Sequence, residues 1–265
     1  MKIALGQMHI RWEDKAANLA RVENWMELLK EKNVDLFTLP EMSLTGFSMH
    51  TELTKETDKI TVAEAEKLSR NYQMAVGIGW VKDEGKFCEN RYSIVTQEGE
   101  ILEYTKLHPF SYSGEDRYFQ GGTVLPVCEY RGYHLGVQIC YDLRFPETFQ
   151  ALSRQADLIL VPANWPGRRR EHWISLLQAR AIENQCYIAG VNCVGDMDGQ
   201  TYTGDSRLYG PDGMLCSGEI LTPADAQPGE CAFIYEIDDQ VKKVRTQFPV
   251  KKDRRDALYR QFYEV

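Results

Sequence analysis

Three polar side chains of different chemistry each follow an apolar segment that has the character of a buried β-strand. They are the carboxylate of Glu41, the ammonium group of Lys106 and the thiol of Cys140. In layered α/β folds functional side chains collect where strands end, because loops there hold them over a cleft. Together these groups could perform nucleophilic catalysis, with attack by sulfur, proton transfer by the carboxylate and stabilisation of an oxyanion by the cation. The preceding segments are Leu-Phe-Thr-Leu (36–39), Ile-Leu-Glu-Tyr-Thr (101–105) and Val-Gln-Ile (137–139).

Cys140 carries the strongest individual signal of the three. It lies between an apolar strand and a helix that Pro146 is predicted to open. A nucleophile at a strand–turn–helix junction is exposed to substrate, and we expect the helix dipole to favour its thiolate form. The alternative for any one of the seven cysteines is a buried structural role.

Glu41 and Lys106 are weaker signals when each is taken alone. A glutamate after a proline is commonly a solvated loop residue, and a lysine at the end of a strand is commonly an edge charge. Their order along the chain, Glu41 then Lys106 then Cys140, supports a shared site. His108 lies two residues beyond Lys106 and is an alternative base, but a cysteine–histidine pair would also need a third orienting residue, which the sequence does not reveal. We expect a turn-forming or gating role for His108.

The three residues lie in sequence blocks that resemble the nitrilase superfamily, also called the carbon–nitrogen hydrolase family. Two blocks, CYDLRFPE and NWP-x-x-R-x-x-x-W, look most like the bacterial branch of ω-amidases, which hydrolyse the terminal amide of short ω-amido dicarboxylates. The blocks follow the family order from the first strand to the C-terminal region: LPEMSLTGF (39–47), YTKLHPF (104–110), GEDRYFQGG (114–122), GVQICYDLRFPE (136–147), NWP (164–166), LLQARAIENQCYIAGVN (176–192) and GDSRLYGPDG (204–213).

This resemblance implies a role for each residue of the triad. Cys140 would form a thioester with release of ammonia, and Glu41 would act as general base. Lys106 and the backbone N–H of Tyr141 would stabilise the oxyanion. Glu115 matches a second glutamate that positions the lysine or the substrate.

The loop Asn164–Arg170 supplies the candidates for substrate binding. Arg169 best matches the arginine of the pattern NWP-x-x-R, and a planar guanidinium can bind the distant carboxylate of an ω-amido acid in a bidentate way. Trp165 is a second candidate in the same loop. The alternative is that Arg168, Arg169 and Arg170 only cap the surface ahead of a helix.

Other functions remain open at this point. Another nitrilase-family amidase, acting on N-carbamoyl amides or on deaminated glutathione, would present a similar carbon to the same triad. A non-catalytic interaction protein is disfavoured because all three triad positions carry suitable residues. A thiol redox sensor based on Cys140 would usually carry a resolving cysteine nearby, and residues 129–185 hold no second cysteine, although Cys186 and Cys193 could approach through the fold.

The elements that must position these residues alternate between strand and helix, with hairpins added. This alternation indicates a mixed α/β architecture, and the resemblance implies a four-layer α-β-β-α sandwich. With no linker or repeat apparent, we expect a single domain over residues 1–265, with a C-terminal arm from about residue 238. We expect strands at 2–7, 35–39, 74–80, 91–96, 101–105, 158–161 and 187–194, and helices at 14–32, 61–71, 146–155 and 170–184.

Composition limits the classes of binding partner and the cellular compartment that we expect for this protein. The formal net charge of −8 disfavours nucleic acid and anionic membranes as partners. No apolar run approaches the ~20 residues that span a bilayer, and the first residues do not resemble a signal peptide. Seven cysteines without a C-x-x-C pair, and five histidines without ligand spacing, predict a reduced cytoplasmic protein with no disulfide, metal or cofactor. The resemblance also implies a homodimer or a larger homo-oligomer.

Overall fold

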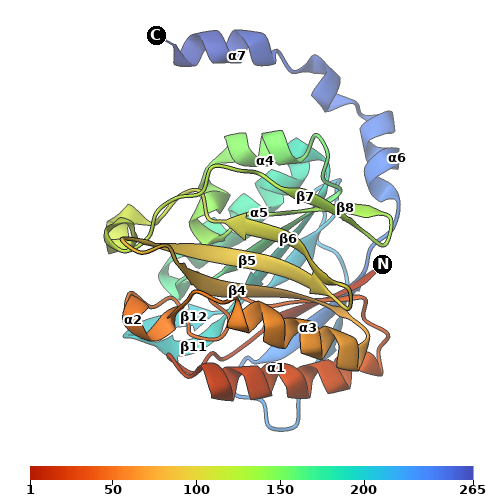
Figure 1. The fold of residues 1–265 in the computed structure, drawn as a ribbon. Coiled ribbons are helices and arrows are strands. Elements are labelled where there is room, and N and C mark those ends of the chain that lie inside the picture. Colours follow the sequence, from red (N-terminus) through yellow and green to blue (C-terminus); the bar gives the residue numbers. More distant parts are fainter. Residues whose placement is uncertain (265) are drawn as a thin grey trace.

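Two β-sheets lie face to face in the computed structural model, which describes residues 1–264 (Figure 1). The first sheet has the strand order β14–β15–β1–β2–β4–β5–β6, with the short strand β3 paired to β4. Its strands are β1 (Lys2–Gln7), β2 (Leu36–Thr38), β3 (Lys55–Glu56), β4 (Ala75–Asp83), β5 (Cys88–Thr96), β6 (Gly99–Thr105), β14 (Glu219–Leu221) and β15 (Cys231–Glu236).

The second sheet has the order β13–β10–β9–β8–β7, and a separate two-stranded hairpin joins β11 to β12. All six residues of β9 and all six of β10 are buried, as is typical of parallel strands covered on both faces. The strands are β7 (Val127–Tyr130), β8 (Tyr133–Val137), β9 (Leu158–Ala163), β10 (Tyr187–Asn192), β11 (Val194–Met197), β12 (Gln200–Thr203) and β13 (Arg207–Tyr209).

Helices cover the outer face of each sheet. One apolar cluster joins α1 (Lys15–Lys30) and α3 (Ile60–Tyr72) to the first sheet, a second lies between the two sheets, and a third joins the second sheet to α4 (Pro146–Leu152) and α5 (Arg170–Asn184). The layers therefore run helix, sheet, sheet, helix, and the predicted four-layer α-β-β-α sandwich is confirmed. A short helix, α2 (Thr51–Thr54), was not predicted.

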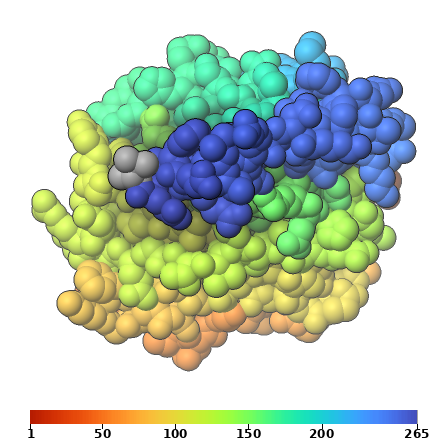
Figure 2. All heavy atoms as spheres, turned by 90° about the horizontal axis from the view of Figure 1, so that it is seen from above, coloured from red at the N-terminus to blue at the C-terminus, as the bar shows by residue number. Residues whose placement is uncertain are grey.

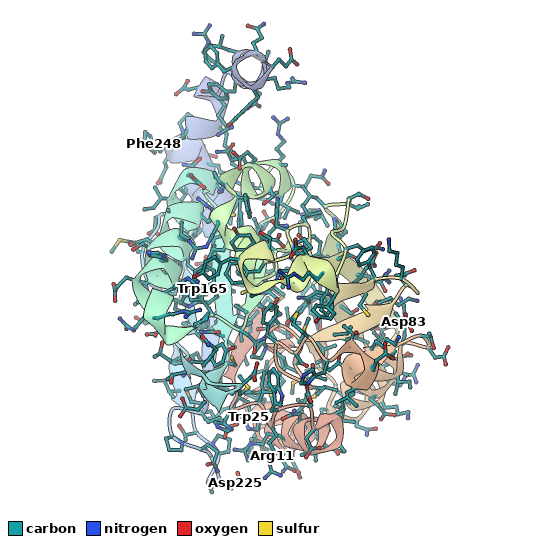
Figure 3. The ribbon with its side chains drawn as sticks, turned by 90° about the vertical axis from the view of Figure 1, so that its left-hand side faces the viewer. Arg11, Trp25, Asp83, Trp165, Asp225 and Phe248 are labelled. Carbon is teal, nitrogen blue, oxygen red and sulfur yellow. The ribbon has the colours of Figure 1, made fainter. Side chains whose placement is uncertain are left out.

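Local sequence explains where the first helix begins and which face it buries. The side chain of Asp14 caps α1 by accepting a hydrogen bond from the backbone N–H of Ala17 at 3.0 Å. Val22, Met26 and Leu29, which follow one another at the three- to four-residue spacing of one helix face, are fully buried. Trp25 is buried with them in the layer between α1 and the first sheet (Figure 3).

Strand direction brings the candidate residues to one end of the molecule. β1, β2 and β4 are parallel to one another, as are β8, β9 and β10. β6 is antiparallel to β5, which is antiparallel to β4, so β6 ends at the same edge as β2. The loops that follow β2, β6, β8 and β9 therefore meet, and they carry Glu41, Lys106, Cys140 and Asn164.

The chain leaves the first sheet after β15 through a C-terminal segment that lies outside the layers. It consists of α6 (Gln240–Gln247), a 3-10 turn at Val250–Asp253 and α7 (Asp256–Tyr263). Seen from above, this segment crosses the top of the molecule (Figure 2). Phe248 between α6 and the turn is 69% exposed (Figure 3). Within residues 1–264 no helix combines the length and the apolar character that crossing a membrane requires.

Candidate active site

Glu41 lies in a buried loop that packs against strand β4. Ser43 fixes this loop, because its hydroxyl donates to the carbonyl of Pro40 and accepts from the backbone N–H of Gly79 at 2.8 Å. A Cβ atom at Gly79 would lie 2.4 Å from the nitrogen of Met42, so only glycine permits this approach. The Glu41 side chain is consequently fully buried at the end of β2.

Lys106 is held between two buried carboxylates. Its Nζ atom lies 2.8 Å from Oε1 of Glu41 and 2.9 Å from Oε2 of Glu115. Asn90 on β5 donates its amide to both carboxylates, at 2.8 Å to Glu41 and 3.2 Å to Glu115. The structure thus brings together the two glutamates and the lysine that the sequence singled out, and adds Asn90.

The electrostatics of this cluster keep the lysine positively charged. Burial lowers the pKa of Lys106, but the charges of Glu115 and Glu41 outweigh burial and raise the pKa above its ordinary value. Burial also raises the pKa of Glu115, the charge of Lys106 lowers it, and the charge of Glu41 raises it. A permanently charged ammonium can stabilise an oxyanion but cannot act as a base.

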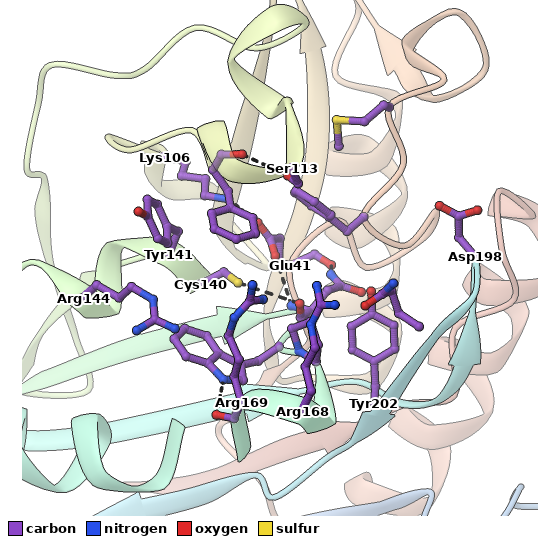
Figure 4. Close-up of a pocket in the computed structure, with 17 residues that line it drawn as sticks. Glu41, Lys106, Ser113, Cys140, Tyr141, Arg144, Arg168, Arg169, Asp198 and Tyr202 are labelled. Carbon is purple, nitrogen blue, oxygen red and sulfur yellow. Dashed lines mark hydrogen bonds and ion pairs between the residues drawn. The ribbon is translucent and has the colours of Figure 1, made fainter. Parts of the chain in front are cut away.

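Cys140 begins a 3-10 turn (Cys140–Arg144) shortly after β8 and has a left-handed backbone, with φ of 45°. A non-glycine residue in this conformation is strained, and such residues cluster at functional sites. Its sulfur lies 3.9 Å from the carbonyl oxygen of Asn164 (Figure 4). Asn164 also donates its backbone N–H to Oε2 of Glu41 at 3.0 Å and its side-chain amide to the carbonyl of Glu41 at 2.6 Å. One asparagine therefore contacts both Cys140 and Glu41.

The expectation that Cys140 is held as a thiolate is wrong. Burial raises the pKa of its thiol well above the ordinary value, and the charge of Glu41 raises it further against the opposing charge of Lys106. The element that follows is a short 3-10 turn rather than an α-helix, so little helix dipole is available to lower the pKa. The thiol is therefore protonated at rest and needs a base beside it.

A cavity of about 220 Å³ opens onto Glu41, Lys106 and Cys140. The guanidinium groups of Arg144, Arg168 and Arg169 point into it (Figure 4). Among residues 1–264, no carboxylate lies within ion-pair distance of these three arginines. The wall also includes Phe47, Phe110, Tyr141, Trp165, Asp198 and Tyr202.

Both predicted substrate-binding residues line this cavity. Arg169 lies over the rings of Phe110 and Tyr112, with its guanidinium carbon 5.3 and 5.5 Å from their centroids. Trp165 is buried, and its indole N–H donates to the carbonyl of Arg169 at 2.8 Å. Arg170 instead turns outward and pairs with Asp205 at 2.7 Å, so the surface-cap alternative describes Arg170 alone.

Sequence reasoning missed Arg144 as a candidate binding residue. Its guanidinium carbon lies 4.7 Å from the centroid of the Trp165 ring. Burial and the charge of Arg169 lower the pKa of Arg144, which shows that two cations share one wall. Its position one turn after Cys140, within a block already singled out, is the signal that could have identified it.

Tyr141 and His108 occupy different positions relative to the reacting groups. Tyr141 lines the cavity, and its backbone N–H lies in the first turn after Cys140, where a helix offers no internal acceptor. His108 is not among the described residues that line the cavity, and its Nδ1 atom lies 2.7 Å from Oδ1 of Asp142. This placement does not favour His108 as the base.

Known proteins resemble the chain over nearly its whole length. Residues 2–243 match the protein-family model described as carbon–nitrogen hydrolase. The chain is 35% identical to the ω-amidase YafV of Yersinia enterocolitica over 96% of each protein. It is 30% identical to the 2-oxoglutaramate amidase of Bacillus subtilis, over 96% of this chain and 97% of that protein. The crystal structure of XC1258 from Xanthomonas campestris, a CN-hydrolase superfamily protein with an arsenic adduct in its active site, matches with a TM-score of 0.86 and 30% identity, covering 96% of this chain and 97% of that one.

Proposed function

Because this chain belongs to the carbon–nitrogen hydrolase family, we propose that it is an ω-amidase in which Cys140 is the nucleophile, Glu41 the general base and Lys106 the oxyanion stabiliser. The chain is a hydrolase of carbon–nitrogen bonds other than peptide bonds. One observation carries the residue roles: the thiol of Cys140, whose pKa is raised by burial and by Glu41, lines the same cavity as the buried Glu41 carboxylate, and Oε1 of that carboxylate binds the ammonium group of Lys106.

The reaction begins with proton transfer from the Cys140 thiol to Glu41. The sulfur attacks the amide carbon, and the carbonyl oxygen gains negative charge that Lys106 and the Tyr141 N–H stabilise. Glu41 then passes the proton to the leaving nitrogen, so ammonia departs and a thioester remains. Glu41 next takes a proton from water, the hydroxide attacks the thioester, and that proton returns to the sulfur as the carboxylic acid leaves.

Glu115 acts through Lys106 rather than on the substrate. Its two oxygens lie 3.1 and 2.9 Å from the ammonium group, and the backbone N–H of Phe110 donates to Oε2. Together with the contact to Glu41, these contacts fix the position of the ammonium group. Glu115 is therefore proposed as the positioning residue of the lysine.

The substrate class follows from the charges of the cavity wall. A short dicarboxylate monoamide carries its carboxylate at the end away from the reacting amide, and three arginines without a carboxylate partner face Cys140 across a small cavity. A guanidinium can hold that carboxylate through two parallel hydrogen bonds. Arg169 and Arg144 are the proposed anchors, and the Trp165 ring is the proposed apolar wall between them.

Ammonia release by the purified protein tests this function. We expect turnover of α-ketoglutaramate and succinamate, slower turnover of a neutral aliphatic amide, and none above background for Cys140→Ala. Cys128→Ala is the matched control, because Cys128 is half-buried on β7 outside the cavity and should leave the rate nearly unchanged. Activity that persists in Cys140→Ala would exclude the thioester mechanism, and a preference for N-carbamoyl amides would exclude the ω-amidase assignment.

We also propose that the chain works as a cytoplasmic homodimer. Seven free cysteines suit a reducing compartment. The C-terminal segment exposes Phe248 at 69%, Phe262 at 66% and Tyr263 at 76%, which is apolar surface that a second copy of the chain could bury. Sedimentation equilibrium should give twice the chain mass of 30.5 kDa, and a single species at the chain mass would contradict the dimer.

A further inference from the structure

A fully buried carboxylate lies two residues after Cys140 and has no part in the steps above. Asp142 makes four polar contacts, two on each oxygen. Oδ2 accepts from the backbone N–H of Ile139 at 2.9 Å and from the hydroxyl of Tyr104 at 2.8 Å. Oδ1 accepts from the backbone N–H of His108 at 3.0 Å and contacts its ring nitrogen Nδ1 at 2.7 Å.

These contacts join two loops whose relative position matters for the proposed reaction. Ile139 immediately precedes Cys140, and His108 follows Lys106 by two residues. One carboxylate therefore ties the turn of the nucleophile to the loop of the oxyanion stabiliser. Removing a partner would leave buried donors or acceptors unpaired, which favours a shift of one loop away from the other.

The His108 ring is itself fixed against the same turn. It stacks on the ring of Phe145 with centroids 3.8 Å apart and an angle of 18° between the planes. Its Nδ1 atom is engaged by Asp142, and the side chain is 31% exposed. Behind the pair, the Tyr104 hydroxyl accepts from the side-chain amide of Gln138 at 3.0 Å, so the network continues into the second sheet.

We propose that Asp142 and His108 form a positioning pair that holds Lys106 at the correct distance from Cys140, and that His108 acts as a hydrogen-bond donor to Asp142 and not as a proton carrier. This inference rests on the proposed function, since it assigns the geometry of that same triad. It accounts for the one buried carboxylate near Cys140 that contacts neither Lys106 nor the cavity.

Replacement of His108 separates a donor from a proton carrier. His108→Ala removes the donor, and we expect kcat to fall roughly 10- to 100-fold, the scale for residues that orient a catalytic group, while KM changes far less because the arginines of the cavity are untouched. His108→Asn should recover most of kcat, because its amide nitrogen can take the place of Nδ1 but cannot carry a proton at neutral pH.

A second histidine–aspartate pair in the chain provides the control. His134 contacts Asp157 through its backbone N–H at 3.0 Å and its Nδ1 atom at 3.2 Å, at the start of β8. His134→Ala should leave kcat and KM unchanged. Thermal melting of each variant checks that the fold is retained, and Asp142→Asn, which turns one acceptor into a donor, should lower kcat as His108→Ala does.

The outcomes distinguish failure of the pair from failure of the proposed function. If His108→Asn is as inactive as His108→Ala, the histidine acts as a proton carrier. If His108→Ala is fully active, the pair has no part in the mechanism. Both results overturn the inference while Cys140→Ala remains inactive. Activity in Cys140→Ala, measured on the same substrate, would instead overturn the proposed function.

Discussion

Individual charges divide the cavity into a reacting side and a binding side. On the reacting side, Lys106 is paired with Glu41 and Glu115, so its charge is compensated before substrate arrives. On the other side, Arg144 and Arg169 lie on one wall, and burial first and then the charge of Arg169 lower the pKa of Arg144. Like charges held together in the free protein favour an anion that neutralises them. A substrate carboxylate is therefore the group that we propose this wall binds.

The binding side predicts a difference between charged and neutral substrates. Arg169→Gln and Arg144→Gln should each raise KM for succinamate by about 10- to 100-fold, corresponding to the ~1.5–3 kcal/mol of a hydrogen bond to a charged group, and should change KM for a neutral amide little. Initial-rate kinetics on the two substrates measures this. Arg170→Gln is the control, because Arg170 pairs with Asp205 away from the cavity. Equal losses on both substrates would place the carboxylate anchor elsewhere.

The residues of the site were predictable from the sequence only where type and order carried information. Glu41, Lys106 and Cys140 each followed an apolar segment, and Glu115 lay in a recognisable block. Asn90 and Asn164 reach the cluster through strand pairing and loop packing, which no local pattern encodes. The protonation state of Cys140 was predicted wrongly because its thiol pKa is raised by burial first and then by the charge of Glu41, and both depend on distant parts of the chain.

At the scale of elements, a close approach between β4 and the loop after β2 determines the position of Glu41, the proposed base. Gly79 leaves room for Met42, and the Gly79 N–H bonds to the hydroxyl of Ser43 at 2.8 Å. Had β4 carried a side chain there, the loop and the Glu41 backbone would have to shift. The alternation of strand and helix predicted the strand itself, but its register against β2 depends on tertiary packing.

The hairpin of β11 and β12 shows what the sequence did not predict among the elements. The position of this hairpin over the cavity was not expected from the sequence. Pro166 bridges to Tyr202, and Gly167 packs against Thr203, so the hairpin is held on the loop that carries the arginines. Asp198 at its turn and Tyr202 on β12 line the cavity as a result. Such contacts depend on the approach of two distant loops.

At the scale of the whole molecule, basic residues hold the C-terminal segment against the end of α4. Arg245 donates to the carbonyls of Ser153 and Ala156 at 3.1 and 3.0 Å, and the Lys251 ammonium donates to the carbonyl of Ser153. Carbonyls at the end of a helix attract cations. Burial lowers the pKa of Lys251, and repulsion from the charges of Arg245, Arg254 and Arg154 lowers it further, to about 8.

This lowered pKa makes the docking of the segment depend on pH with a defined sign. Between pH 8 and the ordinary lysine pKa of about 10.4, the unfolded chain binds the Lys251 proton more strongly than the folded chain does. The contribution of Lys251 to stability therefore rises with pH across this window. Lys251→Met removes this contribution. The melting temperature of the natural protein minus that of the variant should therefore increase between pH 7.5 and pH 10, by an amount on the order of 2 °C. Differential scanning calorimetry at both pH values measures this difference. Subtracting the melting temperature of the variant removes the contribution of the cysteines and tyrosines, which titrate in both proteins.

The control is Lys252→Met, which alters an exposed neighbour of Lys251 and should show no such pH-dependent difference. A gap that stays constant, or that narrows as pH rises, would mean that Lys251 keeps its proton in the folded chain and that repulsion from the three arginines does not govern its titration.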